Sequence, residues 1–325
     1  MTATMPTTGA LVRPDWLDSR AWPHTITTID HGKHQLAVTD AGQGPTLLFV
    51  HVGMWSFVWR DVLAELTPRW RCITFDAPGN GLTTGPARVD LARASTAVDR
   101  VVRELDLSDL ILVVHDLGGP VALDAATEWP ERVRGIAAIN TFAWRPHGAA
   151  FCSMLAMIGS TAVRELDVAT GWLPRLTSTR FGVGRRWDRD LRRTFRRGMH
   201  TRGRRAFHHY LRSARHHDYA RVDHAVECLA DAPVVSVFGE RNDPLGFQPQ
   251  WADRFADIVQ RQVPSGNHFP MCDDPHLVAQ SIETRFGRPA PRSILERRVC
   301  SGLPAGRDSD IPEGGPAAAI LRYSV

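Results

Sequence analysis

The sequence predicts an α/β fold with a mostly parallel central sheet, helices on both faces and an inserted helical cap. Two observations lead to it. Short apolar runs alternate with segments of helical spacing, and one long stretch in the middle has helical patterns but no clear strand. Strands and helices that alternate in short units form parallel sheets covered on both faces. The strand-free stretch, 142–224, is expected to form the cap above the sheet.

Seven segments have the composition of strands. The run 45–51 is apolar through its centre, as in strands buried on both faces, whereas 34–40 alternates. The other five are 71–75, 110–114, 133–139, 233–238 and 258–263. Helices are predicted for 90–105, 118–129, 250–255 and 275–286. The resulting division is a core of 31–141 and 225–286, an N-terminal extension of 1–30, the cap, and an irregular tail of 287–325.

Length and composition indicate one large globular domain. The chain has 325 residues, of which 43% are hydrophobic and 23% charged, and this excludes disorder and fibrous architectures for most of it. It has no run of eighteen apolar residues and no secretory leader pattern, and its five scattered cysteines lack the spacing of a disulfide frame or zinc site. We therefore expect a cytoplasmic protein with reduced thiols, monomeric or weakly dimeric, that does not bind a membrane.

Positive charge is concentrated in the expected cap. Between Arg145 and Arg221 there are 17 arginines and 5 acidic residues, a net of 17 − 5 = +12, whereas the whole chain carries 39 − 35 = +4. Such a segment attracts anions or nucleic acid through its field. Because no nucleic-acid-binding motif accompanies it, the sequence favours a solvated helical surface and no nucleic-acid partner.

The candidate nucleophile is Asp116. The segment 113–119 joins a buried strand directly to a helix, and Gly118 and Gly119 let the tight turn close. A side chain at such a turn is presented at the positive end of the helix dipole. A carboxylate in that place can attack an sp3 carbon and leave an ester on itself, which a base must then help to hydrolyse.

Two further residues follow later strands in the order that such a site needs. Asp243 stands in a turn after the strand 233–238, and His268 stands in a loop before the final helix. Either residue alone could be an ordinary turn or loop residue. Nucleophile, acid and histidine at three strand ends together predict a catalytic set, with His268 as the base and Asp243 holding its imidazole.

The chain resembles the α/β-hydrolases, and within that fold it is most similar to the haloalkane dehalogenases. The likeness runs from about residue 14 to 286. It rests on Asp116 at the tight turn between strand and helix, called the nucleophile elbow in this fold, and on Val114 in place of the glycine usual in serine and epoxide hydrolases. It also rests on the motifs at 55–60, 76–81 and 140–144. The resemblance implies hydrolytic dehalogenation of small haloalkanes, an apolar small-molecule substrate with water, and no metal or organic cofactor. It also implies an oxyanion hole formed by the amides of Gly53 and Leu117.

The chain departs from the family where the family holds its halide. The residue after the nucleophile is usually Trp, and here it is Leu117. At the end of the strand that corresponds to 45–51, the family has His-Gly-Asn-Pro or a similar sequence. In this chain residues 51–54 are His-Val-Gly-Met. Trp55 and Trp144 are the candidate substrate-binding residues that could supply a replacement indole N–H, or else they are core aromatics.

Two alternatives remain open. An epoxide hydrolase would share the Asp116, Asp243 and His268 chemistry but needs tyrosines to protonate the opening ring, and Tyr210 and Tyr219 both fall in the cap segment. A non-catalytic α/β-hydrolase-like protein would instead bind a ligand or partner through the Arg-rich cap. Covalent loading of Asp116 by an alkyl substrate separates these possibilities.

Overall fold

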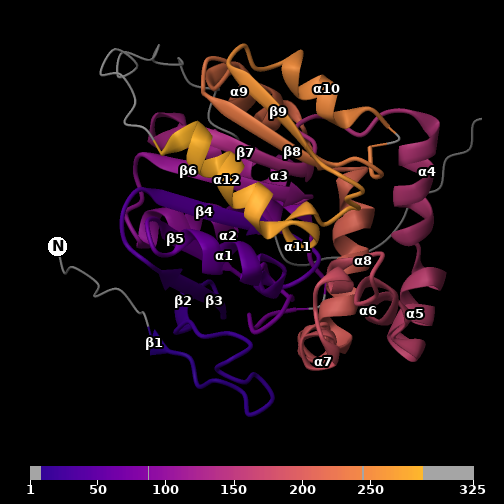
Figure 1. Ribbon diagram of the computed structural model, residues 1–325. Coiled ribbons are helices and arrows are strands. Elements are labelled where there is room, and N and C mark those ends of the chain that lie inside the picture. The colour runs from indigo at the N-terminus through magenta and orange to yellow at the C-terminus, as the bar shows by residue number, and fades with distance from the viewer. Residues whose placement is uncertain (1–8, 87, 244, 288–325) are drawn as a thin grey trace, which may run out of the picture.

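The computed structural model describes residues 9–86, 88–243 and 245–287. Within these residues, nine strands form one sheet in the order β1-β2-β3-β5-β4-β6-β7-β8-β9 (Figure 1). The pairings from β1 to β5 are antiparallel, and those from β5 through β4 to β9 are parallel. Helices cover both faces of this sheet, which confirms the predicted fold class. The predicted tail lies almost wholly outside the described residues.

Seven of the strands are those that the apolar runs predicted. The strands are β1 (Gly9–Ala10), β2 (Thr27–His31), β3 (His34–Ala41), β4 (Thr46–His51), β5 (Arg71–Phe75), β6 (Leu110–Asp116), β7 (Val133–Thr141), β8 (Val234–Gly239) and β9 (Ile258–Val263). The sequence did not predict β1 and β2, which lie in the expected N-terminal extension. Strand β2 contains a single large apolar residue, Ile29, so its pairing with β3 rather than its composition makes it a strand.

The core helices form two layers. One face carries α1 (Arg60–Leu66), α11 (Pro270–Asp273) and α12 (Pro275–Phe286), and the other carries α2 (Leu91–Glu104), α3 (Gly118–Ala126) and α9 (Ala220–Cys228) (Figure 1). Helix α10 (Phe247–Ala252) follows β8, and short 3-10 turns occupy Ser56–Trp59, Pro130–Arg132 and Val183–Arg185. Although α9 begins within the range expected for the cap, it packs on α3 and so extends the core.

Helices α4 to α8 form the cap at one end of the sheet (Figure 1). They are α4 (Ala149–Ile158), α5 (Thr161–Thr170), α6 (Trp172–Thr177), α7 (Arg189–Gly198) and α8 (Thr201–Ala214). This part of the chain contains no strand, as the sequence pattern indicates. The cap segment leaves the sheet after β7 and returns to it through α9.

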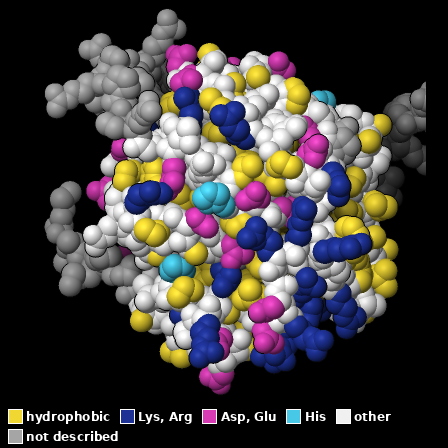
Figure 2. Space-filling model, in the orientation of Figure 1, with side chains coloured by type: hydrophobic (Ala, Val, Ile, Leu, Met, Phe, Trp, Pro, Cys, Tyr) yellow, Lys and Arg dark blue, Asp and Glu magenta, His cyan; other side chains and the backbone are white. Residues whose placement is uncertain are grey.

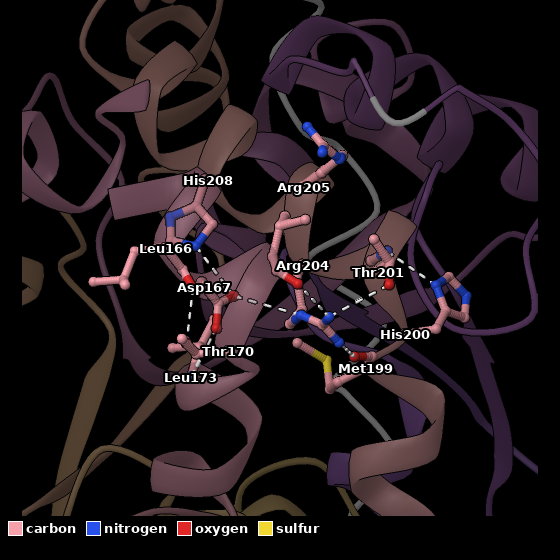
Figure 3. A network of polar contacts seen from close by, with 12 residues as sticks. Leu166, Asp167, Thr170, Leu173, Met199, His200, Thr201, Arg204, Arg205 and His208 are labelled. Carbon is pink, nitrogen blue, oxygen red and sulfur yellow. Dashed lines mark hydrogen bonds and ion pairs between the residues drawn. The ribbon is translucent and has the colours of Figure 1, made fainter. Parts of the chain in front are cut away.

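A buried carboxylate joins the cap helices to one another (Figure 3). Asp167 of α5 accepts a hydrogen bond from the backbone N–H of Leu173 at 2.8 Å and contacts His208 Nε2 of α8 at 3.3 Å. The Nδ1 of His208 in turn lies 2.6 Å from the carbonyl oxygen of Ile158 in α4. Arg204 Nε lies 3.9 Å from the same carboxylate. Because buried charge is costly unless it is paired and hydrogen-bonded, this network fixes the relative positions of α4, α5 and α8.

The arginines of the cap lie mostly in solvent. Dark blue side chains gather on the surface over the region that α6 and α7 occupy (Figure 2). The exposed ones here are Arg175, Arg180, Arg185, Arg186, Arg189, Arg193 and Arg197. Exposed charges are screened at physiological salt, so this face contributes little to stability. The expected solvated helical surface is therefore what this part of the cap presents.

Two expectations concern the environment of the protein. In the described part of the chain, no single helix has the length and apolar character to cross a membrane; α4 and α5 would do so only together, and they are bent by 51°. Cys72, Cys152 and Cys272 carry free thiols, as expected. Cys228 is disulfide-bonded, so the expectation of reduced thiols is wrong at that position.

Two buried histidines join the ends of β4 and β6. His51 and His115 are register partners, and their Nδ1 atoms lie 3.0 Å apart. The Nε2 of His115 lies 2.8 Å from the carbonyl oxygen of His268, which can only accept, so this nitrogen carries the proton. Burial lowers the pKa of His51 to about 4 and the pKa of His115 well below its usual value, so both rings are neutral at pH 7. His51 is therefore the donor between the two Nδ1 atoms.

Helix α3 approaches the sheet through two glycines. A Cβ on Gly118 would lie 2.2 Å from the carbonyl oxygen of Val50 in β4, and a Cβ on Gly119 would lie 2.2 Å from the carbonyl oxygen of Phe142. Real Cβ atoms do not come so close to backbone oxygen. Only glycine at these positions lets α3 begin directly against β4 and the end of β7.

Replacing Gly118 with alanine is expected to destabilise the protein by roughly 1–3 kcal/mol or more, because backbone must move to admit the methyl group. The matched control is Gly203→Ala in α8, where the nearest atoms to a new Cβ are 3.7 Å away. That change should be neutral or slightly stabilising, since alanine favours a helix. Chemical unfolding of both variants measures the difference, and equal stabilities would contradict this view of the elbow.

The histidine pair predicts an acid-sensitive fold. The native pKa of both rings lies below the 6.5 of a free imidazole, so below pH 6.5 the unfolded chain takes up protons that the native state does not. The free energy of unfolding should be unaffected by the pair above pH 6.5 and should fall as the pH drops below that value. For His51 the fall is roughly 1.4 kcal/mol per pH unit down to about pH 4, and His115 adds a loss in the same direction.

Urea unfolding across this pH range tests the prediction. The variant His51→Gln should show a shallower loss of stability than the wild type. His147→Gln, the same change at an exposed position, should keep the wild-type slope. A wild-type slope in His51→Gln would show that the pair does not account for the acid sensitivity.

Candidate active site

Asp116 stands at a strained turn between β6 and α3. Its φ is +52°, in the left-handed region that residues with a Cβ seldom adopt. The hydroxyl of Thr141 donates to the carbonyl oxygen of Asp116 at 2.6 Å, which holds the turn from the neighbouring strand. Backbone strain of this kind costs on the order of 1–3 kcal/mol and persists where the surrounding structure enforces it. The result is a carboxylate held out from the carboxyl edge of the sheet.

The structure brings His268 to this carboxylate. His268 lies in the loop between β9 and α11, and its Nε2 is 3.6 Å from Asp116 Oδ2. The two side chains keep 35% and 23% of their surface exposed, so both are accessible to a small molecule. A carboxylate and an imidazole at this distance can act in turn on one bound carbon and one water.

Both groups line a cavity of about 500 Å³ between the core and the cap. Its wall is mainly apolar, with Met54, Phe142, Ala150, Phe151, Met154, Ile158, Phe207, Leu211, Phe238, Leu245, Phe247 and Phe269. The polar residues on the wall, besides Asp116 and His268, are Asn140, Thr177, Asn242 and Asp243. This size and lining suit a small, largely apolar ligand.

The residue that meets the other nitrogen of His268 is Asn242, not Asp243. Asn242 Nδ2 lies 3.1 Å from His268 Nδ1. The carboxylate of Asp243 accepts hydrogen bonds from the N–H groups of Phe247, at 2.6 Å, and Gln248, at 2.8 Å, at the start of α10. Asp243 thus lines the cavity but serves as a helix cap, and among the described residues no hydrogen bond joins it to His268.

Of the two backbone amides expected to form an oxyanion hole, that of Gly53 already has a hydrogen-bond acceptor. The N–H of Gly53 donates to Asn80 Oδ1 at 3.1 Å, deep in the core, so it is already used. Leu117 follows the nucleophile directly and precedes α3, where helix N–H groups favour negative charge. Of the two candidates, Leu117 is the one whose position suits a developing oxyanion on Asp116.

Neither candidate tryptophan reaches the cavity. The indole N–H of Trp55 donates to the carbonyl oxygen of Phe195 in α7 at 3.2 Å, and its ring stacks on Phe57 at 4.8 Å. Trp144 lies under the guanidinium of Arg254, 4.3 Å from its ring centroid, and its N–H is buried without an acceptor. No tryptophan is among the described residues that line the cavity. Both rings therefore fit the other expectation, that of core aromatics.

The hydroxyls of the two cap tyrosines also form hydrogen bonds outside the cavity. Tyr210 donates to the carbonyl oxygen of Pro78 at 2.7 Å, and Tyr219 donates to that of Ala214 at 3.0 Å. Both are fully buried, and burial raises the pKa of each phenol. Neither hydroxyl is on the cavity wall. They are packing residues and cannot protonate an opening ring in this arrangement.

Three features escaped the sequence reasoning. Asn242 could not be told from its neighbour Asp243, because the turn after β8 does not reveal which residue faces the histidine. The bond between Asn80 and Gly53 joins two loops far apart in sequence. The pairing of His51 and His115 had a visible signal, since each ends a buried strand, but it needs the order of strands in the sheet.

Comparisons with known proteins agree with this geometry. The model of the alpha/beta hydrolase family matches residues 47–281. Haloalkane dehalogenase 2 of Mycobacterium bovis is 26% identical over 282 residues, which is 83% of this chain and 98% of that protein. A haloalkane dehalogenase of Sphingobium indicum is 34% identical over a shorter region of 116 residues, 34% of this chain and 39% of that protein.

Solved structures share the fold at low identity. The epoxide hydrolase CorEH superposes with a TM-score of 0.68 at 17% identity, covering 81% of this chain and 98% of that one. A mutant of the haloalkane dehalogenase DatA from Agrobacterium tumefaciens gives 0.67 at 19% identity, covering 83% of this chain and all of that one. With the family model matching most of the sequence and the elbow, sheet and cap in place, the chain belongs to the alpha/beta hydrolase family.

Proposed function

We propose that this protein hydrolyses small haloalkanes through an alkyl ester on Asp116. The observation that carries the proposal is the pair of Asp116 and His268, 3.6 Å apart on the wall of an apolar cavity of about 500 Å³. An aspartate at the elbow can attack an sp3 carbon and form an ester with it. The names of the relatives, which are haloalkane dehalogenases, support the same substrate class.

The first chemical step is a displacement at carbon. A carboxylate oxygen of Asp116 forms a bond to the carbon that bears the halogen, and the halide leaves with the bonding electron pair. No proton moves in this step.

The second step is hydrolysis of the ester. Water attacks the ester carbonyl of Asp116 while His268 Nε2 takes its proton, and the Leu117 amide donates to the oxyanion that forms. When this intermediate collapses, the bond between the acyl carbon and the alkyl oxygen breaks and His268 returns its proton to that oxygen. The alcohol leaves, and the remaining acid proton passes to solvent, which restores the carboxylate. For Nε2 to accept the proton, the proton of the neutral ring must sit on Nδ1.

The epoxide alternative has less support. Ring opening needs a proton donor near the leaving oxygen, and the hydroxyls of Tyr210 and Tyr219 donate to backbone carbonyls away from the cavity. The expectations of a monomer or weak homodimer, of a cytoplasmic location and of no membrane binding stay predictions.

Alkylation of Asp116 is the central prediction. Incubating His268→Gln with 1-bromobutane should raise the intact mass by one butyl group, and peptide mapping should place it on Asp116, because alkylation needs no base. Asp116→Ala is the control and should gain nothing. During wild-type turnover in oxygen-18 water, the label should enter the carboxylate of Asp116. An unmodified His268→Gln protein, with label only in the alcohol, would overturn the nucleophile assignment.

The leaving group is expected to matter strongly. Because no indole N–H from the described residues faces the cavity, the departing halide is poorly stabilised, and bromide should leave faster than chloride by a margin on the order of tenfold or more. Leu117→Trp should narrow the margin if the ring fits, although overpacking by roughly 1–3 kcal/mol opposes it. The rate of halide release in the first turnover, measured with matched bromo- and chloroalkanes, reports this step alone. Equal first-turnover rates in the wild type would mean that another group already donates to the halide.

A further inference from the structure

The two chemical steps make different demands on this site. Formation of the ester needs only the carboxylate of Asp116 and a carbon with a leaving group. Its hydrolysis needs a nitrogen lone pair to take a proton from water, a counter-charge for the imidazolium that results, and donors for the oxyanion. The residues around His268 and Gly53 bear on the second step alone.

Asn242 turns an amide N–H toward His268, and this contact favours the form of the ring that is not a base. Its Nδ2 is an N–H donor, and it lies 3.1 Å from His268 Nδ1. With the amide in this orientation, Nδ1 is the acceptor, and a ring that carries one proton has it on Nε2. That N–H faces Asp116 Oδ2 at 3.6 Å. In this state Nε2 has no lone pair with which to activate water.

An amide also lacks the charge that would stabilise the protonated ring. In serine hydrolases, exchanging the carboxylate behind the histidine for an amide slows turnover by on the order of ten-thousandfold. Here that position holds an amide in the wild-type chain. Among the described residues, the only carboxylate within 4.0 Å of His268 is that of Asp116, the nucleophile itself.

Neighbouring groups do not replace the missing carboxylate. Both oxygens of Asp243 are bound by the N–H groups at the start of α10. Asn140, which also lines the cavity, is a second amide: its Oδ1 accepts from Gly239 N at 2.7 Å and its Nδ2 donates to the Asn242 carbonyl at 3.2 Å. These bonds hold the turn 239–243 with Asn242, not Asp243, toward His268.

One of the two amides expected to form the oxyanion hole is already engaged. Asn80 is completely buried, and its Oδ1 accepts a hydrogen bond from the N–H of Gly53 at 3.1 Å. Loss of one oxyanion donor slows acyl transfer by on the order of a hundredfold or more. This loss also falls on the second step, because no oxyanion forms while the halide leaves.

We propose that Asn242 makes ester hydrolysis the slow step, so that the protein captures one alkyl group per chain on Asp116 and releases the alcohol slowly. This activity, stoichiometric alkyl capture, rests on the proposed function. Asn242 acts through His268 and is a positioning residue. The chemical class captured is the primary alkyl electrophile with a good leaving group, small enough for the apolar cavity.

Rapid mixing of the protein with excess 1-bromobutane tests the proposal. Bromide release, followed by ion chromatography, should show a burst of one equivalent per chain and then a linear phase slower by roughly tenfold or more, given the cost of an amide behind the histidine. Intact mass during the linear phase should show mainly butylated protein.

Three variants separate the two steps. Asn242→Asp should speed the linear phase by roughly tenfold or more and abolish accumulation of the ester, with the burst rate unchanged. Asn242→Ala, which removes the N–H donor without adding charge, should give a smaller gain and covers the case in which the buried aspartate disturbs folding. Gln280→Glu is the matched control: it makes the same amide-to-carboxylate change at an exposed position of α12 and should alter neither phase.

The outcomes are distinct. Linear bromide release without a burst, with unmodified protein in the steady state, would overturn alkyl capture and leave the proposed function standing. A burst whose linear phase is as slow in Asn242→Asp and Asn242→Ala as in the wild type would overturn the role of Asn242. Absence of both bromide and adduct in every variant would overturn the proposed function itself.

Discussion

The site depends on one constraint, the tight turn that carries Asp116 out of β6 and into α3. The turn requires a positive φ at a residue with a Cβ, and it can close only because Gly118 and Gly119 bring α3 against the backbone of β4 and the end of β7. Thr141, at the end of the next strand, holds the carbonyl of Asp116. The strain at Asp116 is therefore offset by packing along the centre of the sheet, where the structure is least able to relax.

The buried histidines extend this constraint to the base. His115 directly precedes Asp116, and its Nε2 lies 2.8 Å from the carbonyl oxygen of His268, so the backbone of His268 is hydrogen-bonded to the strand that carries Asp116. His51 stands behind it at the end of β4. Both rings stay neutral at pH 7 because burial disfavours their charged form and lowers the pKa of each. This chain of uncharged contacts positions His268 and supplies no counter-charge of its own.

Much of this arrangement could be predicted from sequence because it depends on local pattern. The apolar runs identified the strands from β3 to β9, and the join of strand, aspartate and two glycines identified the elbow. What could not be predicted depends on side-chain direction or on contacts between distant segments. Strand β2 has little apolar character of its own, Trp55 points to α7 instead of the cavity, and Asp243 turns its carboxylate to α10. Composition and spacing do not encode such directions.

In the turn after β8, a shift of one position along the chain decides whether an amide or a carboxylate faces His268. Asn242 and Asp243 are adjacent, both line the cavity, and the sequence alone favours the carboxylate as the partner of the histidine. Asn140 in β7 orients this turn. Its side chain accepts a hydrogen bond from the N–H of Gly239 and donates one to the carbonyl oxygen of Asn242, so the backbone of the turn is held independently of the Asn242 and Asp243 side chains. The first N–H groups of α10 then bind the carboxylate of Asp243. A shift that brought Asp243 to His268 would break these hydrogen bonds and those of Asn140 to form a single new one. The amide behind His268 is thus a property of the fold around β7 and β8, and the proposed slow hydrolysis of the ester rests on it.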